Sequence, residues 1–224
     1  MDLFADRETQ ADAAAGLLAR ALATPLPRTL VVTGGSTPGS VYDRLARLDL
    51  DWAETSITLS DDRWVDETDP DSNAALVSQR LLVGHAATAR FLPLKGSGDS
   101  PEADARAVEP ALRALPPTAA TLLGMGEDGH IASLFPTDPD LGTRLNPIGS
   151  RLCVGVPIAG LAPFVPRITL TVRALLETAL IVLLITGETK RALVESVQRD
   201  SGSALPVAAI LHQTQAPVHV LWAP

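Results

Sequence analysis

The sequence predicts an α/β fold: a single-domain, Rossmann-like arrangement with a mainly parallel sheet and helices on both faces. Short apolar strands alternate along the chain with segments of helical periodicity, which is typical of parallel strands that are buried on both faces. The 224 residues are 46% hydrophobic and 20% charged, the balance of an ordinary globular protein. Because no repeat, low-complexity segment or linker interrupts the chain, residues 1–224 are expected to form one domain.

The expected elements follow from the spacing of the apolar residues. A first helix is expected to end near Thr24-Pro25, because the apolar residues before it recur at helical spacing. Strands are expected at 29–32, 56–60, 119–123, 152–156, 168–172, 180–185 and 218–222. Further helices are expected to run from Pro38 to Leu48, from a cap at Asp71 or Ser72 to Leu82, from about Pro101 to Leu115, and from Glu188 to about Arg199.

Three local details can be predicted as well. Thr37 is expected to cap the second helix, with Pro38 at the first helical position, where the fixed φ angle of proline suits a helix. The polar residues from Ser60 to Asp71 indicate a loop. Pro110 is expected to break or kink its helix, because proline lacks the backbone N–H and its ring clashes with the preceding turn.

Charge and cysteine content exclude several classes of function. The net charge of −8 and the absence of a Lys or Arg run argue against a nucleic-acid partner, and an anionic ligand would need a local cationic pocket. Cys153 is the only cysteine, which rules out a disulfide framework and a multi-thiolate metal site within one chain. The N-terminus lacks the basic start of a signal peptide, and the apolar run 179–185 is far too short to span a membrane. We therefore expect a soluble, cytoplasmic protein that does not bind membranes.

Three polar, glycine-containing segments follow expected strands, at residues 33–38, 60–66 and 124–131. Ligands of open α/β sheets bind beyond the carboxyl ends of the strands, so these segments are expected to meet at one site. The segment Gly34-Gly35-Ser36-Thr37 places flexible backbone and two hydroxyls at a helix N-terminus, which favours phosphate binding. It lacks the lysine and spacing of a Walker A loop, and it is equally compatible with an ordinary strand-to-helix turn.

Two cations are candidates to close around such a phosphate. Arg167 precedes the strand expected at 168–172, and Lys190 lies at the start of a helix that follows another strand. Each of them, taken alone, is also compatible with a solvated surface charge.

The segment Gly126-Glu127-Asp128-Gly129-His130 is the best candidate for catalysis. A histidine can transfer protons near neutral pH, and a carboxylate beside it can fix its tautomer. The segment Asp61-Asp62-Arg63-Trp64 adds two carboxylates and a guanidinium after another strand, although a solvent-exposed turn would have the same composition. His85, His212 and His219 show no spacing that would build a metal site with His130, and no serine lies in a G-x-S-x-G motif.

These motifs resemble the 6-phosphogluconolactonase family, within the superfamily that includes glucosamine-6-phosphate deaminase. The resemblance covers nearly the whole chain, in order, and is carried by 33–38, 59–65, 69–73, 122–136, 166–171 and 186–190. Deaminase-like members are expected to have Asp-Glu-Tyr in place of Asp61-Asp62-Arg63, and Ala-Phe-Asn-Glu in place of Ala132-Ser133-Leu134-Phe135, so both positions favour the lactonase. Asp62 stands where the lactonases usually have a glutamate.

The resemblance implies a sugar-phosphate isomerase/deaminase-like fold and the hydrolysis of 6-phospho-D-glucono-1,5-lactone, without a metal or an organic cofactor. His130 would act as general base, Asp128 would orient it, and Arg63 would stabilise the oxyanion. Asp61 would organise Arg63 or the sugar hydroxyls, and the phosphate would be held by Gly34, Gly35, Ser36, Thr37, Arg167 and Lys190. A small phosphorylated lactone is then the expected partner, and the chain is expected to be a monomer or a weak homo-oligomer. The alternatives are a related deaminase or isomerase, and a non-catalytic sugar-phosphate sensor.

Overall fold

The computed structural model describes residues 1–23, 25–157 and 164–224. Its main sheet has seven strands, which pair in the order β1-β10-β9-β6-β2-β3-β5 and run parallel at every pairing. This result confirms the predicted mainly parallel sheet. The strands are β1 (Asp2–Leu3), β2 (Arg28–Val32), β3 (Thr55–Leu59), β5 (Arg90–Leu92), β6 (Thr118–Gly124), β9 (Ile181–Thr186) and β10 (Val218–Ala223).

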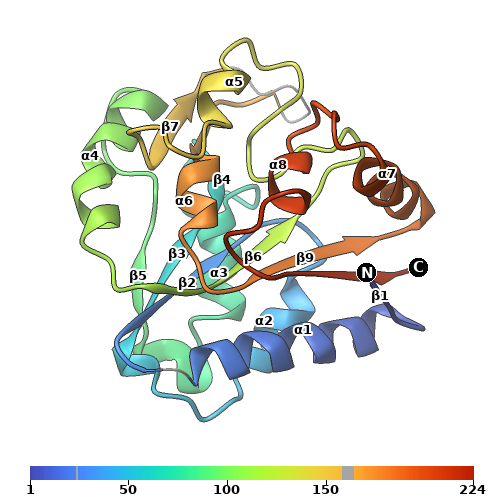
Figure 1. Cartoon of the computed structure of the whole chain (residues 1–224). Helices are drawn as coiled ribbons and strands as arrows, with labels where there is room; N and C mark the ends of the chain where they lie inside the picture. The colour runs from blue at the N-terminus through green and yellow to red at the C-terminus, as the bar shows by residue number, and fades with distance from the viewer. Residues whose placement is uncertain (24, 158–163) are drawn as a thin grey trace.

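Helices cover both faces of this sheet, as predicted. Helices α1 and α2 lie on one side of the sheet, and α7 and α8 lie on the other (Figure 1). The helices are α1 (Arg7–Leu22), α2 (Gly39–Leu45), α3 (Asn73–Arg80), α4 (Pro101–Arg113), α5 (Leu141–Arg144), α6 (Val172–Leu176), α7 (Glu188–Arg199) and α8 (Ala208–Leu211), with short 3-10 turns at Trp52–Glu54 and Gly84–Thr88. Among the described residues, none of these helices is long and apolar enough to cross a membrane.

A second, smaller sheet was not predicted. Its three antiparallel strands pair in the order β4-β8-β7, with β4 (Asp61–Arg63), β8 (Arg167–Leu170) and β7 (Cys153–Val156). The prediction of a loop from Ser60 to Asp71 is therefore wrong at its start, because residues 61–63 pair with β8. This pairing brings Arg63 directly opposite Arg167.

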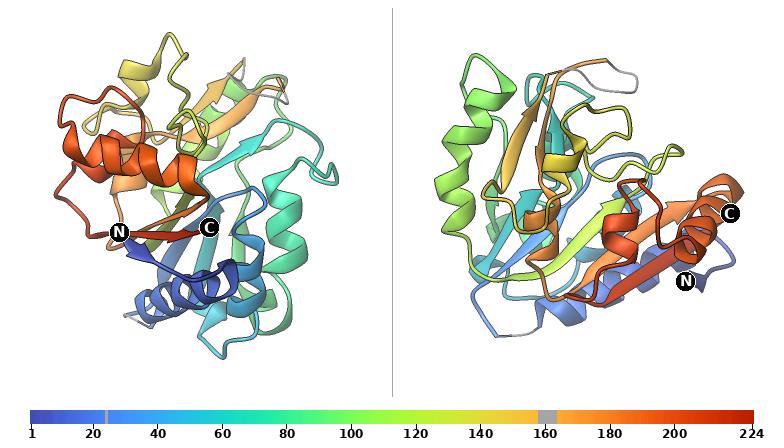
Figure 2. Two further views of the ribbon diagram at one scale, coloured as in Figure 1. Left: turned by 90° about the vertical axis from the view of Figure 1, so that its right-hand side faces the viewer. Right: turned by 45° about the horizontal axis from the view of Figure 1, so that its top comes forward.

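Helix α4 packs along β7, the edge strand of the small sheet, and supplies hydrogen-bond acceptors to the backbone at that edge (Figure 2). The Glu109 carboxylate accepts hydrogen bonds from the backbone N–H groups of Leu152 (2.9 Å) and Cys153 (3.2 Å), and Glu102 accepts one from Gly155 (3.0 Å). Carboxylates thus take the place of a neighbouring strand, which leaves no unpaired N–H at these three positions. Cys153 is fully buried, and burial raises the pKa of its thiol far above the usual range.

Two helix predictions were wrong in detail. Thr37 does not cap α2: Pro38 occupies the N-cap position and provides no side-chain hydrogen bond, and Thr37 lines a cavity instead. Pro110 does not break α4: the helix continues through it to Arg113, and the Pro110 carbonyl accepts from the N–H of Ala114 (3.2 Å). Ser72 caps α3 as predicted, since its hydroxyl accepts from the N–H of Ala75 (3.2 Å).

Candidate functional site

A cavity of about 250 Å³ opens where β2, β6 and β9 end. The three segments predicted to meet there all contribute to its wall, together with residues of β8 and α7. It is lined by Thr33, Gly34, Gly35, Ser36, Thr37, Pro38, Asp61, Arg63, Asn73, Gly124, Met125, Gly126, His130, Ala132, Arg167, Leu184 and Lys190. Nine of the ten predicted site residues are in this list, and Asp128 lies directly behind it against His130.

A second hollow of about 360 Å³ lies between the sheet and α4, away from these residues. Its wall is mostly apolar, and its charged groups, Arg113 and Glu177, are both held in ion pairs with residues four positions away. The candidate catalytic residues therefore line the cavity of about 250 Å³, although the hollow beside α4 is larger.

His130 and Asp128 form a hydrogen-bonded pair at the edge of the cavity. Nδ1 of His130 lies 2.6 Å from Oδ1 of Asp128. A carboxylate at this distance holds the proton on Nδ1, which leaves the lone pair of Nε2 for a substrate or a water. The ring also packs against Phe135, with their centroids 4.8 Å apart.

Glycine at position 126 is required by this pair. A Cβ on Gly126 would lie 2.1 Å from Nδ1 of His130 and 2.6 Å from Oδ1 of Asp128. The backbone cannot move aside easily, because the N–H of Gly126 donates to the carbonyl of His130 (2.9 Å) and its own carbonyl accepts from Gly129 (3.1 Å). Gly129 has a φ of 81°, which side-chain-bearing residues rarely adopt.

Asp61 lies in the wall of the cavity and is almost fully buried. Its carboxylate accepts from the hydroxyl of Ser133 (2.6 Å) and from that of Ser60 (3.0 Å). These bonds tie the end of β3 to the loop that carries His130. Within the part of the chain that the structure describes, no ion pair joins Asp61 to Arg63.

Arg63 and Arg167 place two positive charges on one wall of the cavity. They are direct partners across β4 and β8, an arrangement that is destabilising for like charges unless an anion lies nearby. Burial, and then the charge of Arg63, lowers the pKa of Arg167. A bound phosphate or oxyanion would relieve this repulsion, so the pair favours an anionic ligand.

Asp62 does not face the cavity. It accepts from the backbone N–H groups of Asn73 (2.6 Å) and Ala74 (3.1 Å), and so it binds the N-terminus of α3. Burial raises the pKa of Asp62 to about 6, although these two hydrogen bonds act in the opposite direction. A carboxylate in this position holds the fold rather than the ligand.

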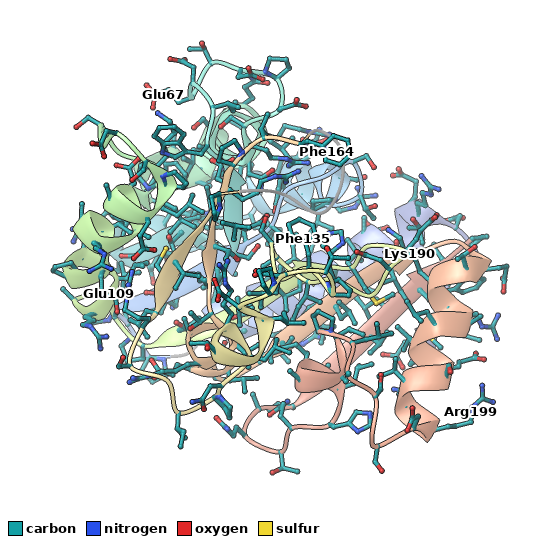
Figure 3. All side chains as sticks on the ribbon, turned by 90° about the horizontal axis from the view of Figure 1, so that it is seen from above. Glu67, Glu109, Phe135, Phe164, Lys190 and Arg199 are labelled. Carbon is teal, nitrogen blue, oxygen red and sulfur yellow. The ribbon has the colours of Figure 1, made fainter. Side chains whose placement is uncertain are left out.

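The opposite wall is built from the glycine loop and α7. Gly34 to Thr37 line the cavity, and so does Lys190 in the first turn of α7. Seen from above, Phe135 lies near the middle of the molecule and Lys190 at the start of α7 (Figure 3). Burial lowers the pKa of the Lys190 ammonium, against the charge of Glu127, which raises it. An anion in the cavity would replace the water that this ammonium has lost.

Sequence reasoning missed four residues of this site: Asn73, Gly126 as a contact of the imidazole, Ser133 and Phe135. Asn73 and Gly126 line the cavity, Ser133 binds Asp61, and Phe135 contacts both His130 and Arg167, whose guanidinium carbon lies 6.0 Å from the ring. The signals available were the position of Ser133 and Phe135 directly after the His130 motif and that of Asn73 at the end of the motif 69–73. Among the described residues, no group of three or more His, Cys, Asp or Glu side chains is arranged to hold a metal ion.

Known proteins show which family the chain is similar to. The model of the family "Glucosamine-6-phosphate isomerases/6-phosphogluconolactonase" matches residues 5–222. A protein of Caulobacter vibrioides named 6-phosphogluconolactonase is 45% identical over 227 residues, covering 100% of this chain and 97% of that protein. One of Mesorhizobium japonicum with the same name is 38% identical and covers 99% and 94%. The crystal structure of a 6-phosphogluconolactonase from Shewanella baltica has a TM-score of 0.92 at 32% identity, covering 100% and 97%.

Proposed function

This chain belongs to the family of glucosamine-6-phosphate isomerases and 6-phosphogluconolactonases, and we propose that it hydrolyses 6-phospho-D-glucono-1,5-lactone to 6-phospho-D-gluconate in the oxidative pentose phosphate pathway. The observation that carries this proposal is one cavity that joins a histidine–carboxylate pair to a wall of cations. The pair supplies a base for water, and the cations match a phosphorylated substrate.

The reaction begins at Nε2 of His130, which takes a proton from a water molecule as that water attacks the lactone carbonyl. The new C–O bond converts the carbonyl into a tetrahedral oxyanion, which Arg63 stabilises. As the oxyanion collapses, the bond from the carbonyl carbon to the ring oxygen breaks, and the imidazolium returns its proton to that oxygen. The product is an open-chain acid that ionises, and His130 is neutral again.

Asp128 keeps His130 in the reactive tautomer and stabilises the imidazolium, and Asp61 binds sugar hydroxyls or shapes the wall beside Arg63. The phosphate lies on the loop formed by Gly34, Gly35, Ser36 and Thr37, with Arg167 and Lys190 closing around it. An activated ester needs only a positioned base and a polarised carbonyl, so this mechanism calls for no metal or organic cofactor.

We extend the proposal to the working form of the protein. Residues 1–224 act as one lactonase domain in the cytoplasm, as a monomer or a weak homo-oligomer. The single-domain part of this proposal is supported by a cavity whose lining comes from residues 33 to 190 of the chain.

A coupled assay tests the activity. The chain is given freshly made 6-phosphogluconolactone, the 6-phosphogluconate formed is oxidised by an added dehydrogenase, and the rate of spontaneous hydrolysis is subtracted. We expect enzymatic turnover of the phosphorylated lactone and far slower turnover of unphosphorylated gluconolactone. Release of ammonia from glucosamine 6-phosphate without lactone turnover would indicate a deaminase instead, and saturable binding with no turnover would indicate a sensor.

A further inference from the structure

Arg63 reaches the cavity on a long and flexible side chain, and something must hold its guanidinium in place. Its direct strand partner is Arg167, which repels it. Among the described residues, the Arg63 guanidinium makes one hydrogen bond in the structure: its Nη1 group donates to Oδ1 of Asn73. The position of Arg63 therefore depends on Asn73.

The Asn73 amide can take only one orientation. Its Nδ2 donates to the carbonyl oxygen of Asp61 (2.8 Å), while its Oδ1 accepts from Arg63. Turning the amide over would place its NH₂ against the guanidinium and its oxygen against the Asp61 carbonyl, so both hydrogen bonds would become repulsions. The acceptor is thus presented to Arg63 in a fixed direction.

The backbone of Asn73 is fixed as well. Asn73 is the first residue of α3, directly after the cap Ser72, and its N–H donates to the Asp62 carboxylate (2.6 Å). The side chain is almost fully buried. It also occupies the space that a side chain at position 34 would need, since a Cβ on Gly34 would lie 1.7 Å from Oδ1 of Asn73. Asn73 therefore lies between the phosphate-binding loop and Arg63 and contacts both.

From this geometry we infer that Asn73 is a positioning residue for lactone hydrolysis: it holds the Arg63 guanidinium against the repulsion of Arg167, in the direction from which it meets the oxyanion. This inference rests on the role of Arg63 in the proposed function. Asn73 does not touch the reacting atoms and acts through Arg63 alone.

The test compares Asn73→Ala, Arg63→Ala and the double variant with the wild-type chain, using kcat and KM for 6-phosphogluconolactone. A misplaced oxyanion donor costs about 10–100-fold in rate, so Asn73→Ala should lower kcat by that factor and change KM by less than about threefold. Because Asn73 acts through Arg63, the double variant should have the kcat of Arg63→Ala, with no further loss.

Ser72→Ala is the matched control, because Ser72 stabilises the same helix start without touching the cavity. It should lower the melting temperature and leave kcat within about threefold of the wild type. The isosteric Asn73→Asp is the second variant in case Asn73→Ala does not fold. It keeps the side-chain volume, but it places an oxygen against the Asp61 carbonyl oxygen and a negative charge against the Arg63 guanidinium. The repulsion displaces the acceptor and the new charge offsets that of Arg63, so this variant should also lose about 10-fold or more in kcat.

The outcomes distinguish a failure of the proposed role of Arg63 from a failure of the inference on Asn73. Normal kcat in Arg63→Ala would overturn the proposed role of Arg63, whatever Asn73 does. An impaired Arg63→Ala with a normal Asn73→Ala would overturn the inference on Asn73 alone. The inference would also be overturned if the kcat losses of the two single variants multiplied in the double variant, or if Ser72→Ala were as slow as Asn73→Ala. Either result would show that Asn73 has a general structural effect.

Discussion

Replacing Gly126 with alanine should disable His130 without altering any catalytic group. The added Cβ would lie 2.1 Å from Nδ1 of His130, where ordinary contact begins at 3.4 Å, so the imidazole must move by about 1.3 Å or rotate away from Asp128. Either movement breaks the bond of 2.6 Å that fixes the tautomer. A misplacement of about 1 Å in a catalytic group costs on the order of 100-fold in rate, and we expect kcat to fall by that factor.

The assay is the steady-state hydrolysis of 6-phosphogluconolactone, with two glycine-to-alanine changes for comparison. Gly142→Ala lies on the surface, where a Cβ meets nothing within 4 Å, and should leave kcat unchanged. Gly124→Ala adds its methyl group to the wall of the same cavity, also with no contact within 4 Å, and should lose much less activity than Gly126→Ala.

For Gly126→Ala, the reasoning also predicts the behaviour of KM. The proposed phosphate contacts are on the glycine loop and on Arg167 and Lys190, so KM should change little in Gly126→Ala. If Gly126→Ala kept a kcat within about threefold of the wild type while remaining folded, the imidazole would not need its present position, and the assignment of His130 as the base would be refuted.

Three further predictions concern other parts of the molecule. His130→Ala should lower kcat by roughly 100-fold or more, measured in the same coupled assay, because general-base catalysis contributes at least that much. Lys190→Ala should raise KM for the phosphorylated lactone by about 10-fold and leave the slow hydrolysis of gluconolactone unchanged, because the proposed role of the lysine is to bind the phosphate alone. Glu109→Gln should lower the free energy of unfolding by about 1–3 kcal/mol at neutral pH, measured by urea denaturation, because the neutral amide binds the N–H groups of Leu152 and Cys153 less strongly.

The pH dependence of Glu109→Gln has a definite sign. Burial opposes ionisation of Glu109, but hydrogen bonds from the N–H groups of Leu152 and Cys153 and from the side chains of Arg151 and Arg113 outweigh it and lower the pKa below its ordinary value of 4.5. The carboxylate therefore stabilises the fold above pH 4.5, and this contribution is lost as the pH falls through the lowered value. The difference between variant and wild type should shrink in that acidic range. Glu177→Gln, at an exposed pair, is the control, and an equal loss there would contradict the argument.

The main sheet could be predicted because its strands carry their own signal. β2 and β9 are buried along nearly their whole length, and each contains a short continuous apolar run, residues 30–32 in β2 and 181–185 in β9. Strand β4 has no such signal. Its residues Asp-Asp-Arg have low strand propensity, and they pair only because β8 and the start of α3 supply partners that come later in the chain.

In the site, too, some contacts could be predicted from the local sequence and others could not. His130 and Asp128 lie two residues apart, so their contact could be predicted from local spacing. The roles of Asp62 and Asn73 could not, because both side chains have chemistry suited to a ligand and the tertiary fold directs Asp62 to the helix start instead. Thr37 illustrates the reverse case: a sequence typical of a helix cap has its side chain in the cavity wall.

The small antiparallel sheet has a consequence for how the protein matures. Residues 61–63 pair with residues 167–169, and β6 pairs with β9. Each of these two pairings closes a long loop of chain. On the ribosome, a nascent chain that has not yet exposed residues 167–190 lacks three residues of the cavity wall, Arg167, Leu184 and Lys190. Enzymatic turnover is therefore expected to appear only after the last strands have docked, which makes activity a sensitive reporter of completed folding.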